Sequence, residues 1–319
     1  MTATDVAPPA APAAPPLRPS KRGRSGLTKT EQRWGMLFAL PAVLGFLIFT
    51  VGPMIASLIM SLTDWRIGAP ISFTGVENYQ RMASDDLFWK SLGVTTYYTL
   101  GSVPAVLIVG FFVAMLVNTG VRGKSLWRTI YYLPTLVPAV ASAVLWIWIF
   151  NPDSGLLNSA LRSAGLPGSN WIYDERTAIP SLILMSTWGF GNAMVIFLAG
   201  LQGVPTDLYE AVALDGGGAW AKFRHVTLPF MTPTIFYNLV TGVIGTFQAF
   251  NQAYIMTNGG PNNSTLFYIY YLYTKAFTDG EMGYASALAW VLFIIVLIVT
   301  VLMFRNARRW VFYEMGGAR

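Results

Sequence analysis

The 319-residue chain contains no cysteine, only one histidine and few charges. Without cysteine, disulfides and cysteine-ligated metals or clusters are excluded. The lone histidine, His225, argues against a zinc or haem site built on several histidines. Only 11% of the residues are charged, against about 25% in an average soluble domain. With 54% hydrophobic residues, this composition indicates a membrane protein that has no metal site or cofactor of its own.

Charges are also missing from the long apolar runs. Six runs are each long enough to cross a bilayer of about 30 Å, which takes roughly 20 helical residues. Only the third contains a charge, Arg128, near its start. The lack of charges near the centre of any run argues against an ion-coupled carrier. Backbone polar groups in lipid must be satisfied internally, so an all-α membrane protein with six transmembrane helices is predicted. The runs cover about residues 34–62, 93–118, 126–150, 178–201, 230–257 and 285–304.

The remaining segments predict the topology. Ser264–Phe277 is tyrosine-rich and too short to span, so we expect an interfacial helix in an aromatic belt. With the N-terminus in the cytoplasm, 15 of the 21 Lys and Arg residues lie on the cytoplasmic side, as the positive-inside rule requires. The net charge of +6 then reflects topology and anionic headgroups rather than nucleic acid.

Three regions are expected along the chain. Residues 1–28 are rich in Ala and Pro and then basic, which predicts a disordered cytoplasmic tail. Residues 29–310 form the six-helix transmembrane domain, and 311–319 form a cytoplasmic C-terminal tail. Several prolines lie inside the runs and are typical of bends in membrane helices: Pro41, Pro53, Pro104, Pro134, Pro138 and Pro233.

One cytoplasmic connection, residues 202–229, is far longer than the connections of about two to eight residues that are usual between helices. It contains "LYEAVALDGGGAWAKFRHVTLP". Thr206 and Asp207 predict a helix start, and three glycines from Gly216 predict its end, followed by a short second helix from about Ala219. Apolar residues interspersed with Glu210 favour a docking surface, although a plain solvated connector remains an alternative.

The spacing within this connection resembles the EAA loop of binding-protein-dependent ABC importer permeases. That pattern is Glu-Ala-Ala, three residues, Gly, nine residues, Ile-x-Leu-Pro. Val212 and Val226 depart from it, and Gly217 stands where alanine is usual. The segments 250–265 and 282–290 resemble the carbohydrate-uptake subfamily, of the maltose-permease type. The matching residues of the loop are Glu210, Ala211, Gly216, Leu228 and Pro229.

The resemblance implies that the loop forms a coupling helix in a cleft of a separate ATPase. Glu210 would pair with a basic group there, Ala211 and Leu214 would pack into the cleft, and Gly216 would allow the turn. The predicted coupling residues are Glu210, Ala211, Leu214, Asp215, Gly216 and Pro229.

The same resemblance implies the chain's partners. They are a second permease subunit, two ATPase subunits that bind ATP and Mg, and an extracytoplasmic solute-binding protein. The assembly would sit in the bacterial inner membrane, with both termini of this chain in the cytoplasm, and import a carbohydrate by alternating access. The chain itself would catalyse no reaction.

Polar residues in two spans predict a substrate pathway. In the fifth run, Asn238, Thr241 and Gln248 recur at helical spacing, followed by Asn251 and Gln252. In the fourth run, Trp188 and Asn192 are four residues apart. Amides buried in lipid are costly, so this face should meet protein or water, and a sugar needs amide partners and aromatic faces. Tyr97, Tyr98 and Trp146 offer further aromatic faces. Hydrogen bonding between helices would use the same residue types.

Two other functions remain open. A secondary carrier is disfavoured by the lack of charges within the spans, and a non-transporting membrane scaffold would need no pathway at all. The segment 120–125, "GVRGKS", is only partly similar to a phosphate loop, because Asn118 stands where the first glycine is required. The ATPase is therefore expected on a different chain.

Overall fold

The computed structural model describes residues 29–119 and 123–312, so the predicted N-terminal tail, part of the segment 120–125 and residues 313–319 lie outside it. Within those ranges the regular structure is helical, with one isolated β-bridge between Thr63 and Phe73. Short 3-10 or π segments, labelled η, adjoin several α-helices. The elements are α1 (Lys29–Phe46), η1 (Leu47–Val51), α2 (Gly52–Ser61), α3 (Glu77–Ala83), α4 (Asp86–Asn118), α5 (Lys124–Tyr132), η2 (Leu133–Leu136), α6 (Ala139–Ile149), α7 (Leu156–Ser163), η3 (Trp171–Tyr173), α8 (Ala178–Thr187), α9 (Gly191–Gln202), α10 (Thr206–Leu214), α11 (Ala219–Lys222), η4 (Phe223–Thr227), α12 (Leu228–Phe247), η5 (Gln252–Thr257), α13 (Tyr268–Tyr273), η6 (Thr274–Thr278) and α14 (Met282–Ala307).

Long apolar helices account for most of the chain. Four are long and apolar enough to cross a membrane: Arg33–Ser61, Asp86–Asn118, Ala219–Phe247 and Met282–Ala307. Two further helix pairs pass the same test together but are bent, α5 and η2 with α6 by 94° and α8 with α9 by 45°. The described residues therefore hold four candidate spans, or up to six if each bent pair is one span. The all-helical membrane architecture is confirmed.

The chain divides into two compact units, one ending at Ile55 and the other beginning at Ala56. The first holds α1, η1 and the start of α2. None of its described side chains is buried. A helix that is apolar all round is suited to lipid or to a partner chain.

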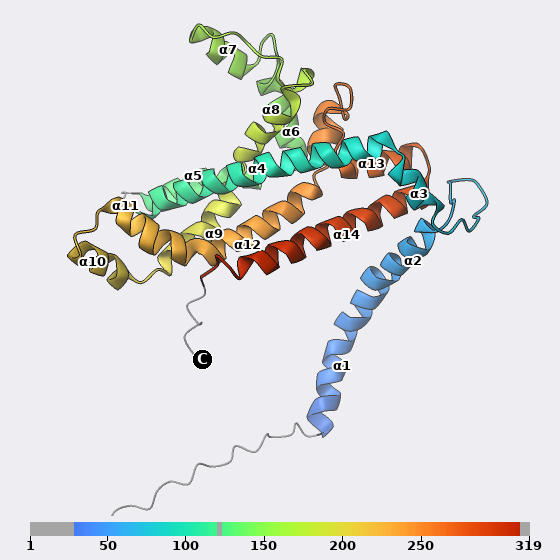
Figure 1. The fold of residues 1–319 in the computed structure, drawn as a ribbon, viewed down its shortest axis with the longest axis horizontal. Coiled ribbons are helices and arrows are strands. Elements are labelled where there is room, and N and C mark those ends of the chain that lie inside the picture. The colour runs from blue at the N-terminus through green and yellow to red at the C-terminus, as the bar shows by residue number, and fades with distance from the viewer. Residues whose placement is uncertain (1–28, 120–122, 313–319) are drawn as a thin grey trace, which may run out of the picture. The chain divides into compact units, whose positions relative to one another are not determined.

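Helix α4 is the centre of the second unit. It packs against α8, α9 and α12, and α12 in turn packs against α14. Figure 1 shows α4, α12 and α14 side by side, while α6 turns away from them. A Cβ on Gly110 of α4 would lie 3.2 Å from the Cβ of Ala193 in α9. Glycine here lets two helices approach closely, as small residues do in membrane bundles.

Three of the predicted spans are interrupted in the structure. The predicted run 126–150 breaks at Val137 and Pro138, where proline removes a backbone donor. The run 178–201 breaks between α8 and α9 without any proline, at Trp188–Phe190. The run 230–257 ends as a continuous helix at Phe247. The break near Pro134 and Pro138 agrees with the bend that those prolines predict, whereas the breaks after Thr187 and Phe247 are not predicted from the sequence.

The tyrosine-rich segment forms a short helix as predicted, α13 followed by η6, but its tyrosines do not all face outward. Tyr268 and Tyr271 are 0% and 3% exposed. The Tyr268 hydroxyl donates to the Leu288 carbonyl at 2.9 Å, and the Tyr271 hydroxyl donates to Asp85. Burial in the bundle, with each hydroxyl satisfied, replaces the expected aromatic belt for these two residues.

Asp85 joins three helices at the end of the bundle where α4 begins. Its carboxylate caps α4 by accepting from the backbone N–H of Leu87, and it also accepts from the hydroxyls of Tyr271 and Tyr284. Burial alone would raise the pKa of the Asp85 carboxyl, but the hydrogen bonds to its charged form outweigh burial and hold the pKa below its ordinary value. Arg81 lies 4.3 Å from the centre of the Tyr284 ring.

Asp85→Ala should lower the thermal unfolding midpoint of the purified protein in detergent. Losing a helix cap and hydrogen bonds to a charged acceptor costs about 1–3 kcal/mol of unfolding free energy. Asp86→Ala removes an exposed neighbouring carboxylate and keeps the cap, so it is the matched control. The folded-state pKa is lowered, so the contribution of Asp85 is present above the ordinary pKa of about 3.9 and is lost as the pH falls through the folded-state value. Equal midpoints for the two variants near neutral pH would contradict this role.

Candidate functional site

The predicted coupling loop folds as two helices joined by a tight glycine turn. Helix α10 begins at Thr206 and ends at Leu214, and α11 begins at Ala219, close to the predicted positions. Gly216 has φ +81°, a left-handed conformation that favours glycine. The N–H of Gly217 donates to the Val212 carbonyl at 2.8 Å, and that of Gly216 to the Ala213 carbonyl at 3.1 Å. This pair of bonds is a Schellman motif, which satisfies carbonyls at the end of α10.

Two departures from the EAA pattern meet in this turn. A Cβ on Gly217 would lie 2.6 Å from Cγ1 of Val212 and 2.8 Å from its carbonyl oxygen. Contacts that short do not occur, so the turn as folded requires glycine at 217 next to valine at 212. The sequence comparison with the EAA pattern treats these positions separately, whereas the structure places them in contact.

The second half of the loop is continuous with a span. Residues Ala219–Phe247, comprising α11, η4 and α12, form one helical stretch. Its base is held to α10 by a 3.0 Å hydrogen bond between the hydroxyls of Tyr209 and Thr227. Val226 and Thr227 are buried, and the Phe223 ring stacks on Trp220 with centroids 5.5 Å apart. This hydrogen bond joins α10 to the helical stretch that continues into α12.

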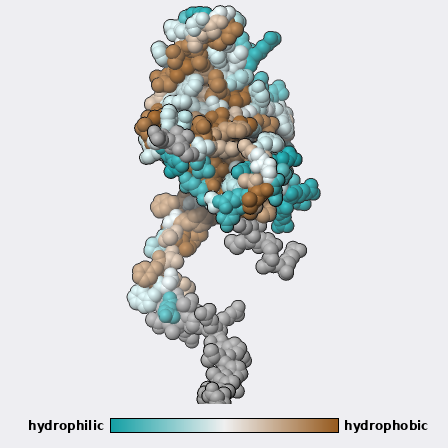
Figure 2. All heavy atoms as spheres, turned by 90° about the vertical axis from the view of Figure 1, so that its left-hand side faces the viewer, coloured by the Kyte–Doolittle hydropathy of each residue, from teal (hydrophilic) through white to brown (hydrophobic). Residues whose placement is uncertain are grey.

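The loop presents large apolar side chains to the outside. Leu214 is 89% exposed and Trp220 69% exposed, and Glu210 and Ala211 of α10 are exposed as well. Figure 2 looks onto the end of the second unit that carries α10 and α11, where hydrophobic and hydrophilic residues alternate. We call Glu210, Ala211, Leu214 and Trp220 the loop patch. Exposed leucine and tryptophan bordered by a carboxylate are typical of a protein docking surface.

Two adjoining, partly open cavities of about 300 Å³ each lie in the second unit. Both are lined by Ser186, Gly189 and Asn192, at the break between α8 and α9. The first also takes in the break between η2 and α6, at Val137, and the start of the stretch after α12, at Asn251. Three interrupted helices thus meet around one space, which we call the central cavities.

Six of the seven predicted pathway residues line the central cavities. One cavity is lined by Trp188, Asn192, Asn251 and Gln252, and the other by Asn192, Asn238 and Thr241. The prediction from spacing alone therefore brings together residues that are neighbours in space. Asn238 and Thr241 also donate to carbonyls of their own helix, at 2.9 Å each to Thr234 and Tyr237, which leaves the amide oxygen of Asn238 without a described donor.

Gln248 lines neither cavity; it is exposed just past the end of α12. The predicted face could not continue through it, because the helix stops at Phe247. In the other direction, sequence reasoning missed Thr135, Ser142 and Ser186, whose hydroxyl-bearing side chains also line the first cavity. Pro134 and Pro138 predict an interrupted helix near Thr135 and Ser142, and this was the available signal for those two residues.

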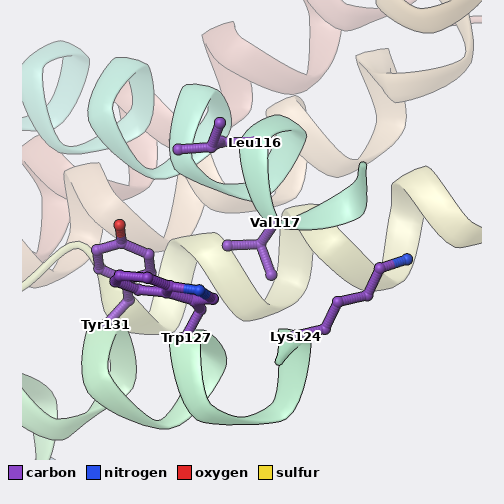
Figure 3. Close-up of a pocket in the computed structure, with 5 residues that line it drawn as sticks. All are labelled: Leu116, Val117, Lys124, Trp127 and Tyr131. Atoms are coloured by element: carbon purple, nitrogen blue, oxygen red, sulfur yellow. The ribbon is translucent and has the colours of Figure 1, made fainter. Parts of the chain in front are cut away.

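A separate cavity of about 230 Å³ lies between the end of α4 and α5 (Figure 3). Leu116 and Val117 of α4 face Trp127 and Tyr131, whose rings stack with centroids 5.9 Å apart. Among the described residues that line it, Lys124 is the charged one, and it points away from the two rings. With so little polar lining, this cavity offers few partners for a hydroxyl-rich solute.

Within residues 29–119 and 123–312, no group of three or more His, Cys, Asp or Glu side chains is placed to hold a metal ion. The charged residues gather at the helix ends instead. Glu281, for example, pairs with Arg81 at 2.8 Å and with Arg66 at 3.3 Å.

Comparison with known proteins places the chain in a family. Residues 106–311 match the family described as "Binding-protein-dependent transport system inner membrane component". The chain is 40% identical over 299 residues to "Probable ABC transporter permease protein YesP" of Bacillus subtilis, covering 92% of this chain and 96% of YesP. It is 33% identical over 292 residues to "Lactose transport system permease protein LacF" of Rhizobium radiobacter, covering 89% and 97%.

A solved structure has the same fold. The chain matches, with a TM-score of 0.77 and 22% identity, a chain of a bacterial ABC transporter involved in the import of the acidic polysaccharide alginate. The match covers 88% of this chain and 98% of the other. In this family the permease is the multi-pass inner membrane component, and ATP is bound by a separate subunit. The chain therefore belongs to the inner membrane components of binding-protein-dependent transport systems and is a permease subunit of an ABC importer.

Proposed function

We propose that this permease subunit carries a sugar or oligosaccharide through the central cavities. The observation that supports this most directly is their lining, in which amides and hydroxyls stand beside the Trp188 ring. A saccharide needs donors and acceptors for its hydroxyls and an aromatic face for its ring. The relative LacF, which is named a lactose transport system permease, supports the same substrate class.

The helix breaks support a pathway at this place. Non-helical backbone at membrane depth is tolerated where it is buried in protein or lines a water-filled cavity. In many transporters the substrate site is formed by discontinuous helices. Here the breaks after Leu136 and Thr187 and the segment at Asn251, after the end of α12, border one space. A pathway at this place would explain why the three interruptions lie together.

The topology follows from the same proposal. Six spans are counted when each bent pair is taken as one, and α10 lies between the fourth span and the fifth, which begins with α11. The positive-inside count places this loop and both termini in the cytoplasm. Residues 29–310 then form the transmembrane domain.

The loop patch is the docking site for an ATPase subunit. Leu214 and Ala211 enter an apolar cleft, Glu210 pairs with a basic group at its rim, and Asp215, Gly216 and Pro229 shape the connection. Closure of an ATPase pair around ATP and Mg pulls on α10, and the continuous stretch from Ala219 to Phe247 passes the movement to Asn238 and Thr241. The cavities thereby open alternately to either side. A second permease subunit and an extracytoplasmic binding protein complete the assembly.

Purification of the tagged chain from its native membrane tests the assembly and the substrate class together. We expect an ATPase and a second permease to co-purify. The reconstituted complex with its binding protein should accumulate a saccharide when ATP is supplied inside, in the presence of a proton ionophore. Uptake that needs a proton gradient and ignores ATP would revive the secondary carrier, and a lone chain that moves no solute would favour the scaffold.

Glu210→Lys should weaken ATPase binding about 30-fold, which corresponds to about 2 kcal/mol, because an attraction becomes a repulsion. Binding is measured with the purified ATPase on permease held in nanodiscs. Glu210→Gln should fall between the wild type and Glu210→Lys. Asp86→Lys makes the same charge change at an exposed position at the far end of α4 and should bind normally. Normal binding by Glu210→Lys would remove Glu210 from the interface.

Asn192→Leu should raise the KM of uptake about ten-fold, the loss expected for one hydrogen bond of about 1.4 kcal/mol to the solute. Asn192 is the test position because it borders both central cavities. Asn306→Leu makes the same change at an exposed site near the end of α14 and should leave KM unaltered. Gln248→Leu, measured in parallel, decides whether the pathway extends past the end of α12. An unaltered KM for Asn192→Leu, with the complex assembled, would return Asn192 to helix packing.

A further inference from the structure

A cavity of about 380 Å³ lies where α4 and α8 begin, at the opposite end of α4 from the α10 loop. Helix α4 contributes Trp89, Gly93 and Tyr97 to one wall. The segment that leads into α8 contributes Glu175 and Arg176 to the other. Neither the coupling loop nor the central cavities include these residues.

The α4 wall has an open gap between two aromatic rings. Trp89, Gly93 and Tyr97 follow at intervals of four residues, so they form one strip that rises about 12 Å along the helix. A Cβ on Gly93 would meet no atom within 4 Å, and the two rings are 56% and 54% exposed. The Trp89 indole N–H donates to the Ala83 carbonyl at 3.0 Å, which fixes the orientation of that ring.

The remaining lining supplies polar groups. Glu175, Arg176 and Lys90 are exposed, and none of them forms a salt bridge with another residue that the structure describes. Ser264 also borders the cavity; it is only 9% exposed, and its hydroxyl has no hydrogen-bond partner among the described residues. A buried hydroxyl without a partner is costly, so a ligand or water there would satisfy it.

We propose that the strip Trp89–Gly93–Tyr97 is an entrance subsite that holds one ring of an oligosaccharide before it reaches the central cavities. The ring lies in the gap above Gly93, its C–H face against an aromatic ring and its hydroxyls toward Glu175 and Arg176. Ile179 lines this cavity and Ser186 lines the central cavities, about 10 Å further along the same helix α8. This inference rests on the proposed carbohydrate transport and adds a second contact point to it.

Aromatic residues near a helix end also suit a lipid headgroup region. Two features favour a sugar. The lining carries both signs of charge, Glu175 beside Arg176 and Lys90, whereas an anionic headgroup would use only the cations. The gap at Gly93 lies between the Trp89 and Tyr97 side chains, where a Cβ would meet no atom within 4 Å. A saccharide uses both the carboxylate and the guanidinium as hydrogen-bond partners.

The absence of cysteine from this chain allows a direct test. Gly93→Cys is made in the full complex, after removing any reactive cysteines from the partner subunits, and is labelled with a membrane-impermeant maleimide. Neutral and uronic oligosaccharides of two to six rings are first scored for ATP-driven uptake by the unmodified complex. Those that are taken up should slow labelling about ten-fold when present at ten times their dissociation constant. Ser84→Cys, at an exposed position just before α4 that does not line the cavity, is the control and should not be protected.

A second variant guards against a labelling artefact. Gly93→Leu fills the gap and should raise the KM for oligosaccharides several-fold, whereas Gly93→Ala should have little effect. Uptake by the unmodified complex without protection of Gly93→Cys, and a normal KM for Gly93→Leu, would overturn the subsite and leave the transport function standing. Protection by phospholipid headgroups instead of sugars would also overturn it. Failure of every saccharide to be taken up would overturn the carbohydrate function, and the subsite with it.

Discussion

The need to satisfy backbone hydrogen bonds inside a bilayer constrains where this fold can be open. An unpaired N–H or C=O in hydrocarbon costs several kcal/mol, so a helix breaks only where protein or water can receive the freed groups. At the end of α8, the N–H groups of Trp188, Gly189 and Phe190 bond to carbonyls three residues back instead of four. The N–H groups of Gln248 and Ala249 do the same after α12. These N–H groups therefore keep hydrogen-bond partners within their own segment, and the turns that they form lie near a shared space.

The unbroken helices have the complementary role. From Ala219 to Asn238 the chain rises about 28 Å as one helical stretch, which joins the end of the loop patch at Trp220 to the cavity lining at Asn238. The hydrogen bond between Tyr209 and Thr227 extends this connection back to α10. The breaks lie beyond Asn238 and on neighbouring helices. The fold therefore separates a continuous helical part next to the loop patch from an interrupted part around the central cavities.

Much of this could be predicted from composition and spacing, and the exceptions have physical causes. Apolar runs predict the helices because membrane insertion depends on summed hydropathy. The break at Pro138 is visible in the sequence because proline lacks a donor. The break at Trp188–Phe190 is not, because it depends on packing between helices that are distant in sequence. The same holds for Tyr271, whose burial depends on Asp85, 186 residues earlier in the chain.

The glycine turn at the end of α10 shows what the structure adds to a comparison with the EAA pattern. Against the pattern, Val212 and Gly217 are two independent and mild departures. In the structure they are a single contact, since the space beside the Val212 side chain and carbonyl is available only when residue 217 has no Cβ. Substitutions at two contacting positions do not change the free energy of unfolding additively, so the effect of a substitution at 212 depends on the residue at 217. Because this turn sets how α10 and α11 are placed, the pair also decides how Leu214 and Trp220 are presented together. The shape of the loop patch therefore depends on two positions that lie outside it.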